Sequence, residues 1–349
     1  MPDTNVQLTT LQSLAADDPR LFDSIVGSRP LVEGGEIKAN SKRTPQIVTA
    51  RGLVLNSMLQ EKEWVVVDRA VMQAAVPPLI AVNELRSRGL VVQMGSIGAM
   101  TREWYMQSEM SAAEVSMTGQ SRSLDQVDLK LTGAPIPVIF KDFIVDARTL
   151  AASRLMGTPL DTTNASAAAR VVAEKMEDLL LNGADVTLAG RALYGLRTHP
   201  NRNTDTAGNY TGGDWGTIDN IHKTVSGMIQ AAVNDDRYGP YMLFAAKTQY
   251  QQAAHVYYTD GSGQTPADRI RAMPEIAGFK MLPRLTDGEL LLVEMSPEVV
   301  EWNETLDIQT REWVSGDGMT TNFKVIAIGG PAIKADYANK SGIVHATGA

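Results

Sequence analysis

The sequence predicts an α+β protein, because helical and strand periodicities occur in separate stretches of the chain. Apolar residues follow a 3.6-residue period over 163–182 and again from Ile218 to Ala232. Apolar and polar residues alternate over 104–131, which indicates a long β-hairpin. Of the 349 residues, 44% are hydrophobic and 21% charged, which suffices for a large core and excludes a disordered or collagen-like chain.

The composition excludes several classes of function. The chain has no cysteine, so it has no disulfide, no thiolate metal site and no cysteine nucleophile. Its 40 acidic and 32 basic residues give a net charge of −8, which argues against a general nucleic-acid binder. Residues 1–20 lack the pattern of a targeting peptide, and the most apolar stretch, 70–82, is too short to cross a bilayer. We therefore expect folding in an aqueous, reducing compartment.

A search for catalytic motifs finds none. The sequence contains no phosphate-binding Gly-x-x-x-x-Gly-Lys-Ser/Thr loop and no Gly-x-Ser-x-Gly elbow. Its four histidines are far apart, so no helix carries a metal-binding pair; they are His199, His222, His255 and His345. The sequence thus predicts a protein that is not an enzyme and needs no cofactor or metal.

The N-terminal region, 1–60, is expected to be an arm. Segments 27–35 and 38–51 are polar and interrupted by glycine and proline, and they offer little core of their own. Such a segment is either a disordered tail or is held by a neighbouring subunit.

Residues 61–103 are expected to form a helix and a connector. Asp68 can cap a helix that bends at Pro77-Pro78 and stops before Gly89.

Residues 104–136 are expected to form the extended hairpin, with its turn near Gly119. Its apolar residues alternate along both arms, and a two-stranded ribbon needs a surface to lie on. That surface is either its own domain or a neighbouring chain. The candidate contact residues are Trp104, Met110, Val115, Met117, Arg122, Val127, Leu129 and Lys130.

Residues 137–216 are expected to contain a short helix near 146–155 and the long helix 163–182. Polar residues, including Glu174 and Glu177, fill the other positions of the long helix, and Gly183 suits its C-terminal end. The polar stretch 197–216 is interpreted as a mobile loop. The residues assigned to the packed face of the long helix are Val171, Val172, Met176, Leu179 and Leu180.

Residues 217–330 are expected to form a compact α+β unit, followed by a C-terminal strand and tail over 331–349. Thr217 and Thr265-Pro266 have the pattern of helix starts. The expected strands are Tyr241–Ala246, Phe279–Leu282, Glu289–Val293, Asp307–Trp313 and Phe323–Ile328.

Several short motifs, in this order, resemble the encapsulin and tailed-phage capsid proteins that share the Hong Kong 97-type fold. The similarity covers roughly residues 61–330, and each motif is weak alone. The matching stretches are Trp64 with Asp68, Leu85–Gly89, Pro135–Phe140, Phe143–Arg148, Ala168–Gly183, Tyr194-Gly195-Leu196 and Tyr238-Gly239-Pro240-Tyr241.

The resemblance implies an architecture and a structural function. It makes 1–60 an N-terminal arm and 104–136 the extended hairpin or E-loop. A peripheral domain then carries 163–182 as its spine helix, and Tyr238–Tyr241 leads into an axial domain over 217–330. It implies a major capsid protein that assembles into pentamers and hexamers of an icosahedral phage head. The alternative is an encapsulin-type nanocompartment shell that encloses cargo enzymes.

The same resemblance implies the partners. The chain would bind copies of itself and enclose double-stranded DNA without sequence-specific binding, with scaffolding, portal and decoration proteins as further partners. It would reside in the virion and assemble in the bacterial cytoplasm, without a membrane. The 60 preceding residues and the tail 335–349 favour the phage alternative. Some phage relatives cross-link a hairpin lysine, but Lys130 lies away from the tip and is interpreted as a surface lysine.

The sixteen methionines fit contact surfaces that re-pack between slightly different environments. Ordinary core filling explains them equally well.

Overall fold

The computed structural model describes residues 31–33, 36–38, 61–113, 115, 117, 125–156, 162–258, 263–314 and 320–349. The chain divides into two compact units, residues 1–56 and 57–349. In the first unit, β1 (Leu31–Glu33) pairs antiparallel with β2 (Glu36–Lys38). The region predicted to be an arm without structure of its own therefore includes a short strand pair.

A four-stranded sheet organises one part of the second unit. Its order is β3 (Val91–Gln93), β13 (Val300–Val314), β14 (Thr320–Ile333) and β6 (Val138–Asp146). The antiparallel pair β13–β14 is long, and its register shifts near Leu306 mark β-bulges. The strands predicted at 307–313 and 323–328 belong to this sheet. Their assignment to the α+β unit over 217–330 was wrong, because β13 pairs with β3 and β14, and β14 pairs with β6, rather than with the strands of that unit.

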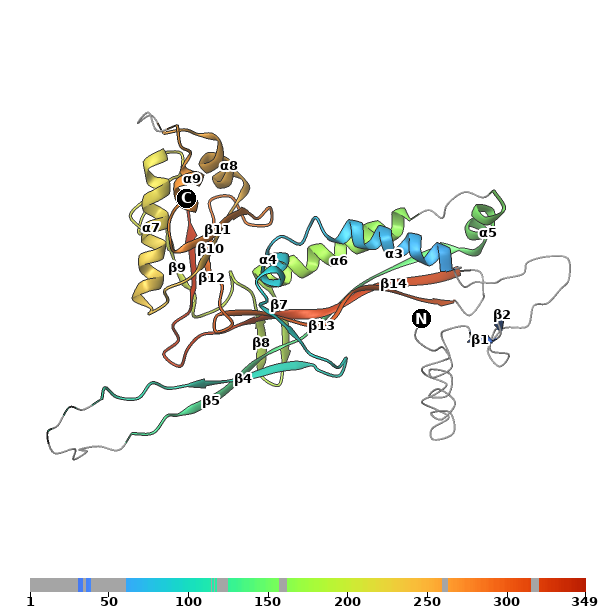
Figure 1. Cartoon of the computed structure of the whole chain (residues 1–349), viewed down its shortest axis with the longest axis horizontal. Coiled ribbons are helices and arrows are strands. Elements are labelled where there is room, and N and C mark those ends of the chain that lie inside the picture. Colours follow the sequence, from blue (N-terminus) through green and yellow to red (C-terminus); the bar gives the residue numbers. More distant parts are fainter. Residues whose placement is uncertain are drawn as a thin grey trace. The chain divides into compact units, whose positions relative to one another are not determined.

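Helices cover one face of this sheet (Figure 1). α6 (Thr163–Asn182) packs against β6 and β14, and α3 (Glu61–Ala75) lies alongside α6. Alternate residues of β14, among them Phe323 and Val325, are buried toward α6. A short helix, α5 (Ala147–Met156), follows β6 as predicted.

The predicted bent helix is in fact two helices. α3 ends at Ala75, and α4 (Ala81–Ser87) begins after Pro77-Pro78. Proline lacks the N–H that a continuous helix requires, so the break falls at this pair. Asp68 lies inside α3 and does not cap it, whereas Gly89 follows α4 with the expected positive φ of 72°.

A five-stranded sheet forms the other part of the second unit. Its order is β11 (Ile276–Met281), β10 (Tyr241–Ala245), β12 (Leu290–Glu294), β15 (Ile343–Thr347) and β9 (Asn203–Thr206). All five residues of β10 are buried, with Met242 and Phe244 in one apolar cluster and Tyr241, Leu243 and Ala245 in the other. A strand covered on both faces has no polar alternation, which explains its continuous apolar run.

α7 (Ile218–Asn234), α8 (Lys247–His255) and α9 (Pro266–Arg271) belong to the part of the second unit that contains this sheet. The predicted start of α9 is confirmed, because Thr265 and Asp268 form a reciprocal capping box. The interpretation of 197–216 as a loop was incomplete. This stretch supplies β9, and its Trp215 is buried.

The predicted hairpin consists of β4 (Thr101–Gln107) and β5 (Leu129–Pro135), which pair antiparallel. The ladder ends at the pair Gln107–Leu129. Residues 108–113 and 125–128 continue the two arms without regular strand structure, so the predicted strand alternation there was wrong. A second hairpin, β7 (Gly183–Leu188) with β8 (Arg191–Tyr194), lies beside β5.

Candidate assembly surfaces

The base of the β4–β5 hairpin is anchored by charged groups. Glu103 of β4 forms an ion pair with Arg191 of β8. The Lys334 ammonium lies 5.6 Å from the centre of the Trp104 ring and 2.8 Å from a carboxylate oxygen of Glu301. The cation over the indole ring and the half-buried ion pair hold the base of the β4–β5 hairpin against the rest of the second unit.

The rest of the ribbon exposes apolar side chains. Tyr105 is 68% exposed and lies opposite Leu131 across the ladder, while Leu129, at 65%, follows on the same face. Trp104 belongs to the other face, where it is half-buried opposite Thr132. The apolar residues expected on the two arms, such as Trp104 on β4 and Leu129 on β5, therefore lie on opposite faces of the hairpin. Tyr105, on the same face as Leu129, was not among the expected contact residues.

The outer part of the hairpin is more exposed still. Met110 is 58% exposed, and Val115 and Met117 are fully exposed. Ser108 N donates to Asp128 O at 2.9 Å, and Ser111 N donates to Asp125 Oδ2 at 2.6 Å, so the two arms stay joined beyond the ladder. The Ser111 hydrogen bonds lower the pKa of Asp125.

The remaining candidate residues of the hairpin differ in position. Val127 is half-buried and Lys130 is exposed. Arg122 lies outside the described residues.

A second apolar surface lies on the four-stranded sheet, on the face opposite α6. Phe140 and Ile144 of β6 are 55% and 57% exposed, and Trp313 of β13 is 43% exposed. The Lys324 ammonium lies 4.5 Å from the centre of the Phe140 ring and 5.4 Å from that of Trp313. Clustered apolar side chains around one cation are typical of a contact surface rather than of scattered surface residues.

α6 fills its predicted role with one exception. Val172, Met176, Leu179 and Leu180 are buried in the apolar core. Val171 is 49% exposed, so its assignment to the packed face was wrong. One residue turns a helix by about 100°, which carries Val171 off the face that holds Val172.

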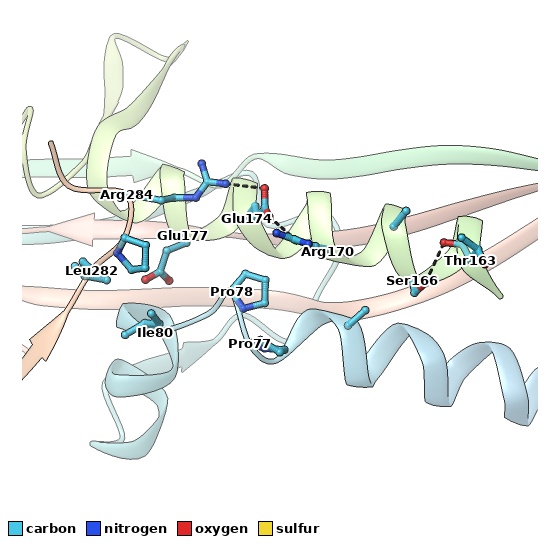
Figure 2. A pocket seen from close by; sticks show the side chains of 13 residues that line it. Pro77, Pro78, Ile80, Thr163, Ser166, Arg170, Glu174, Glu177, Leu282 and Arg284 are labelled. Carbon is cyan, nitrogen blue, oxygen red and sulfur yellow. Dashed lines mark hydrogen bonds and ion pairs between the residues drawn. The ribbon is translucent and has the colours of Figure 1, made fainter. Parts of the chain in front are cut away.

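Glu177, expected on the polar face of α6, is instead buried at 2% exposure. Its Oε1 accepts from the Ala81 amide at 2.6 Å and its Oε2 from the Val82 amide at 3.2 Å. Figure 2 shows this carboxylate directed at the start of α4, beside Ile80. Burial raises the pKa of Glu177, and the amide hydrogen bonds oppose that rise. Glu177 thus satisfies N–H groups that the first turn of a helix leaves unpaired.

Replacing Glu177 with alanine should destabilise the chain by about 3 kcal/mol, because two buried amides lose their acceptor and a cavity opens. Glu177→Gln keeps one acceptor oxygen and should cost less than half as much. Urea unfolding followed by circular dichroism measures both variants. Equal losses for the two variants would contradict the helix-start role of this carboxylate.

A groove of about 840 Å³ runs beside Glu177, between α6, the Pro77-Pro78 turn and the segment after β11 (Figure 2). Glu174 occupies its rim and forms ion pairs of 2.8 Å with both Arg170 and Arg284. Its floor is mostly apolar. The other lining residues are Ala74, Pro77, Pro78, Ile80, Thr163, Ser166, Ala167, Leu282 and Pro283.

The segment Tyr238–Tyr241 leads into β10 as expected. Tyr238 is 68% exposed, whereas Tyr241 is fully buried and its hydroxyl donates to the Arg237 carbonyl. Burial, with Glu294 and Glu275 nearby, raises the pKa of Tyr241 to about 12. Gly239 has a φ of 88°, a backbone conformation that residues with a side chain rarely adopt.

Within the described ranges, no group of His, Asp and Glu side chains is arranged to hold a metal ion. In the same part of the chain, no helix combines the length and the apolar character needed to cross a membrane.

The chain belongs to a family described as "Family of unknown function (DUF6260)", whose profile matches residues 54–346. It is also 26% identical, over 272 residues, to the Type 1 encapsulin shell protein EncA of Myxococcus xanthus. That alignment covers 77% of this chain and 88% of EncA.

Solved structures share the fold. A virus-like particle from Pyrococcus furiosus matches with a TM-score of 0.58 at 17% identity, covering 80% of this chain and 97% of the other. The capsid of Myoviridae Phage XM1 matches with a TM-score of 0.59 at 14% identity, covering 76% and 92%. The chain therefore has the Hong Kong 97-type fold that the sequence motifs predicted, a fold that it shares with a virus-like particle and a phage capsid.

Proposed function

We propose that this chain is the major capsid protein of a tailed phage and that it assembles into the pentamers and hexamers of an icosahedral head. The observation that carries the proposal is the apolar surface that the fold leaves uncovered. Val115 and Met117 are fully exposed at the outer part of the hairpin, in a chain whose fold is that of shell and capsid subunits. Large apolar side chains with this exposure indicate a protein contact surface.

The arrangement of these surfaces favours a ring of copies. The hairpin and the open face of the four-stranded sheet are different surfaces, so a contact between them is heterologous, and repeated heterologous contacts close into rings. In this proposal, a hairpin docks on the sheet face around Phe140 and Trp313 of the next copy. The arm 1–60 braces a further neighbour. Assembly interfaces of this kind bury thousands of Å².

The proposed contents are double-stranded DNA, held without sequence-specific contacts. The net charge of −8 supports a wall from which DNA can be released, because like charge does not retain phosphate. Such a head would be assembled in the bacterial cytoplasm and would form part of the virion. Scaffolding, portal and decoration proteins are its expected partners.

A second candidate function is an encapsulin-type shell that encloses cargo enzymes. It is favoured by the 26% identity to EncA, which extends over 88% of that encapsulin. Both candidates use the same assembly surfaces and differ in what the shell contains.

Electron microscopy of purified particles, combined with a measurement of their nucleic-acid content, tests the proposal. Closed shells that contain DNA, or that carry a tail at one vertex, are the expected result. Shells filled with a co-purifying enzyme would establish the encapsulin alternative. A chain that remains monomeric at all concentrations would refute both.

A further inference from the structure

A buried cluster of basic and titratable side chains lies where the end of α6 meets the five-stranded sheet. We call Arg197, His199, Arg202, Glu289 and His345 the junction cluster. His199 and His345 are 7% and 5% exposed, so both rings lie in the interior. The cluster ties the segment 195–202, which follows β8, to β15 and to the start of β12.

Glu289 is the carboxylate of this cluster. Its Oε1 lies 2.6 Å from Arg197 Nη2 and 3.8 Å from His345 Nε2. Arg197 also donates to Asn182 at the end of α6, at 3.0 Å. Glu289 thus pairs with Arg197 and lies near His345. With two arginines and one carboxylate, the cluster carries a net positive charge even with both histidines neutral.

Both histidine rings use Nδ1 as an acceptor. Arg202 Nε lies 3.5 Å from His345 Nδ1, and the Asn201 amide lies 3.3 Å from His199 Nδ1. An arginine N–H and a backbone N–H can only donate, so each Nδ1 is unprotonated and the ring proton is on Nε2. A second proton must therefore arrive at an atom that is already occupied by a donor.

The groups around the two rings offer little negative charge to stabilise the positive charge that this proton would add. Across the sheet, His345 lies between Leu291 of β12 and Thr204 of β9, which are uncharged. His199 borders a recess that is also lined by Lys130, Arg191 and Tyr194. Arg191 is already paired with Glu103, and the carboxylate that lies near His345, that of Glu289, is already paired with Arg197.

We propose that the junction cluster is an acid-sensitive joint between the end of α6 and the five-stranded sheet. Protonation of His199 or His345 breaks an existing hydrogen bond and adds charge beside Arg202, so segment 195–202 and the adjoining β9 separate from β15. At neutral pH the joint is closed, and it opens as the solution becomes acidic. This behaviour belongs to the single chain and does not depend on what a shell contains.

The direction of the pH dependence follows from linkage. Burial, together with Arg202, lowers the pKa of His199 from 6.5 to about 4, and burial lowers that of His345. The open joint therefore binds protons more tightly than the closed one. The closed joint has its full stability above about pH 6.5 and loses it progressively as the pH falls toward 4. At about pH 5, His199 alone should shift the opening equilibrium about thirtyfold.

Hydrogen exchange followed by mass spectrometry on the full chain tests the proposal, at about pH 7 and about pH 5 after correction for intrinsic rates. We expect the protection of residues 195–206 and 343–347 to fall at least tenfold on acidification, while α7 keeps its protection. His199→Asn with His345→Asn keeps an acceptor near each Nδ1 position but cannot be protonated, so this pair should remove the pH dependence.

His222→Asn is the matched control, because His222 is an exposed histidine on α7. It should behave as the wild-type chain does. Each single variant, His199→Asn or His345→Asn, provides a test if the pair does not fold. The proposal is overturned if wild-type protection at the junction is the same at both pH values, or if it falls equally in α7.

Discussion

A chain that carries Val115→Asp and Met117→Asp should fold normally and fail to assemble. Both side chains are fully exposed, so their replacement should change the free energy of unfolding by less than about 0.5 kcal/mol. In the proposed shell they are covered by a second copy, and burying two unpaired carboxylates there costs several kcal/mol per contact. Because a shell repeats each contact many times, assembly should be lost almost completely.

Two measurements separate folding from assembly in this variant. Thermal unfolding should give a midpoint within a few degrees of the wild-type value, while sedimentation and electron microscopy should detect no particles. The control is Val115→Ile with Met117→Leu, which keeps apolar side chains of similar volume and should assemble. Wild-type particle yield from the aspartate variant would exclude the outer hairpin from the interface.

The sequence predicted those elements whose periodicity is set by local burial. The spacing of α6 and the alternation along β4 and β5 reflect one packed face each, so both are visible in a short window. It could not predict the partners of β13 and β14. β6 lies near residue 140 and pairs with β14 near residue 325, and such a choice depends on the whole fold.

The candidate surfaces also divide into parts that the sequence predicts and parts that it does not. The apolar residues at the outer hairpin could be predicted, because apolar residues near a polar turn stand out in the sequence. The burial of Glu177 could not be predicted, because its spacing among the polar residues of α6 is that of a solvent-exposed side chain. Its burial is set by α4, 96 residues earlier in the chain, where two amides need an acceptor. The residues next to Glu177 in the sequence therefore give no indication that its side chain is buried.

The motif Tyr194-Gly195-Leu196, first noted as a family resemblance, has a physical role at the end of α6. A helix leaves its last four carbonyls without partners. Here Gly183 N donates to Leu179 O, Leu196 N to Leu180 O at 2.9 Å, and Arg197 N to Leu181 O at 2.8 Å. The fourth carbonyl, of Asn182, accepts from the Thr198 hydroxyl at 3.0 Å. The segment 195–198 thus completes the hydrogen bonding of the helix.

Gly195→Ala should therefore be strongly destabilising. A methyl group on Gly195 would overlap the backbone of Gly183 and Leu181, and backbone atoms on both sides leave no flexible side chain to move away. The segment would have to lift from the helix end, which exposes or orphans the carbonyls that it covers. We expect a loss of at least about 3 kcal/mol, from overpacking together with unpaired carbonyls.

Gly208→Ala is the matched control, because a methyl group there has open space and Gly208 has no positive φ. It should be neutral or should stabilise the chain slightly by restricting the unfolded state. Chemical unfolding of both variants beside the wild-type chain measures the difference. Similar stabilities for Gly195→Ala and Gly208→Ala would mean that the end of α6 tolerates a shift of its covering segment. Helix capping by residues 195–198 would then contribute little to the fold.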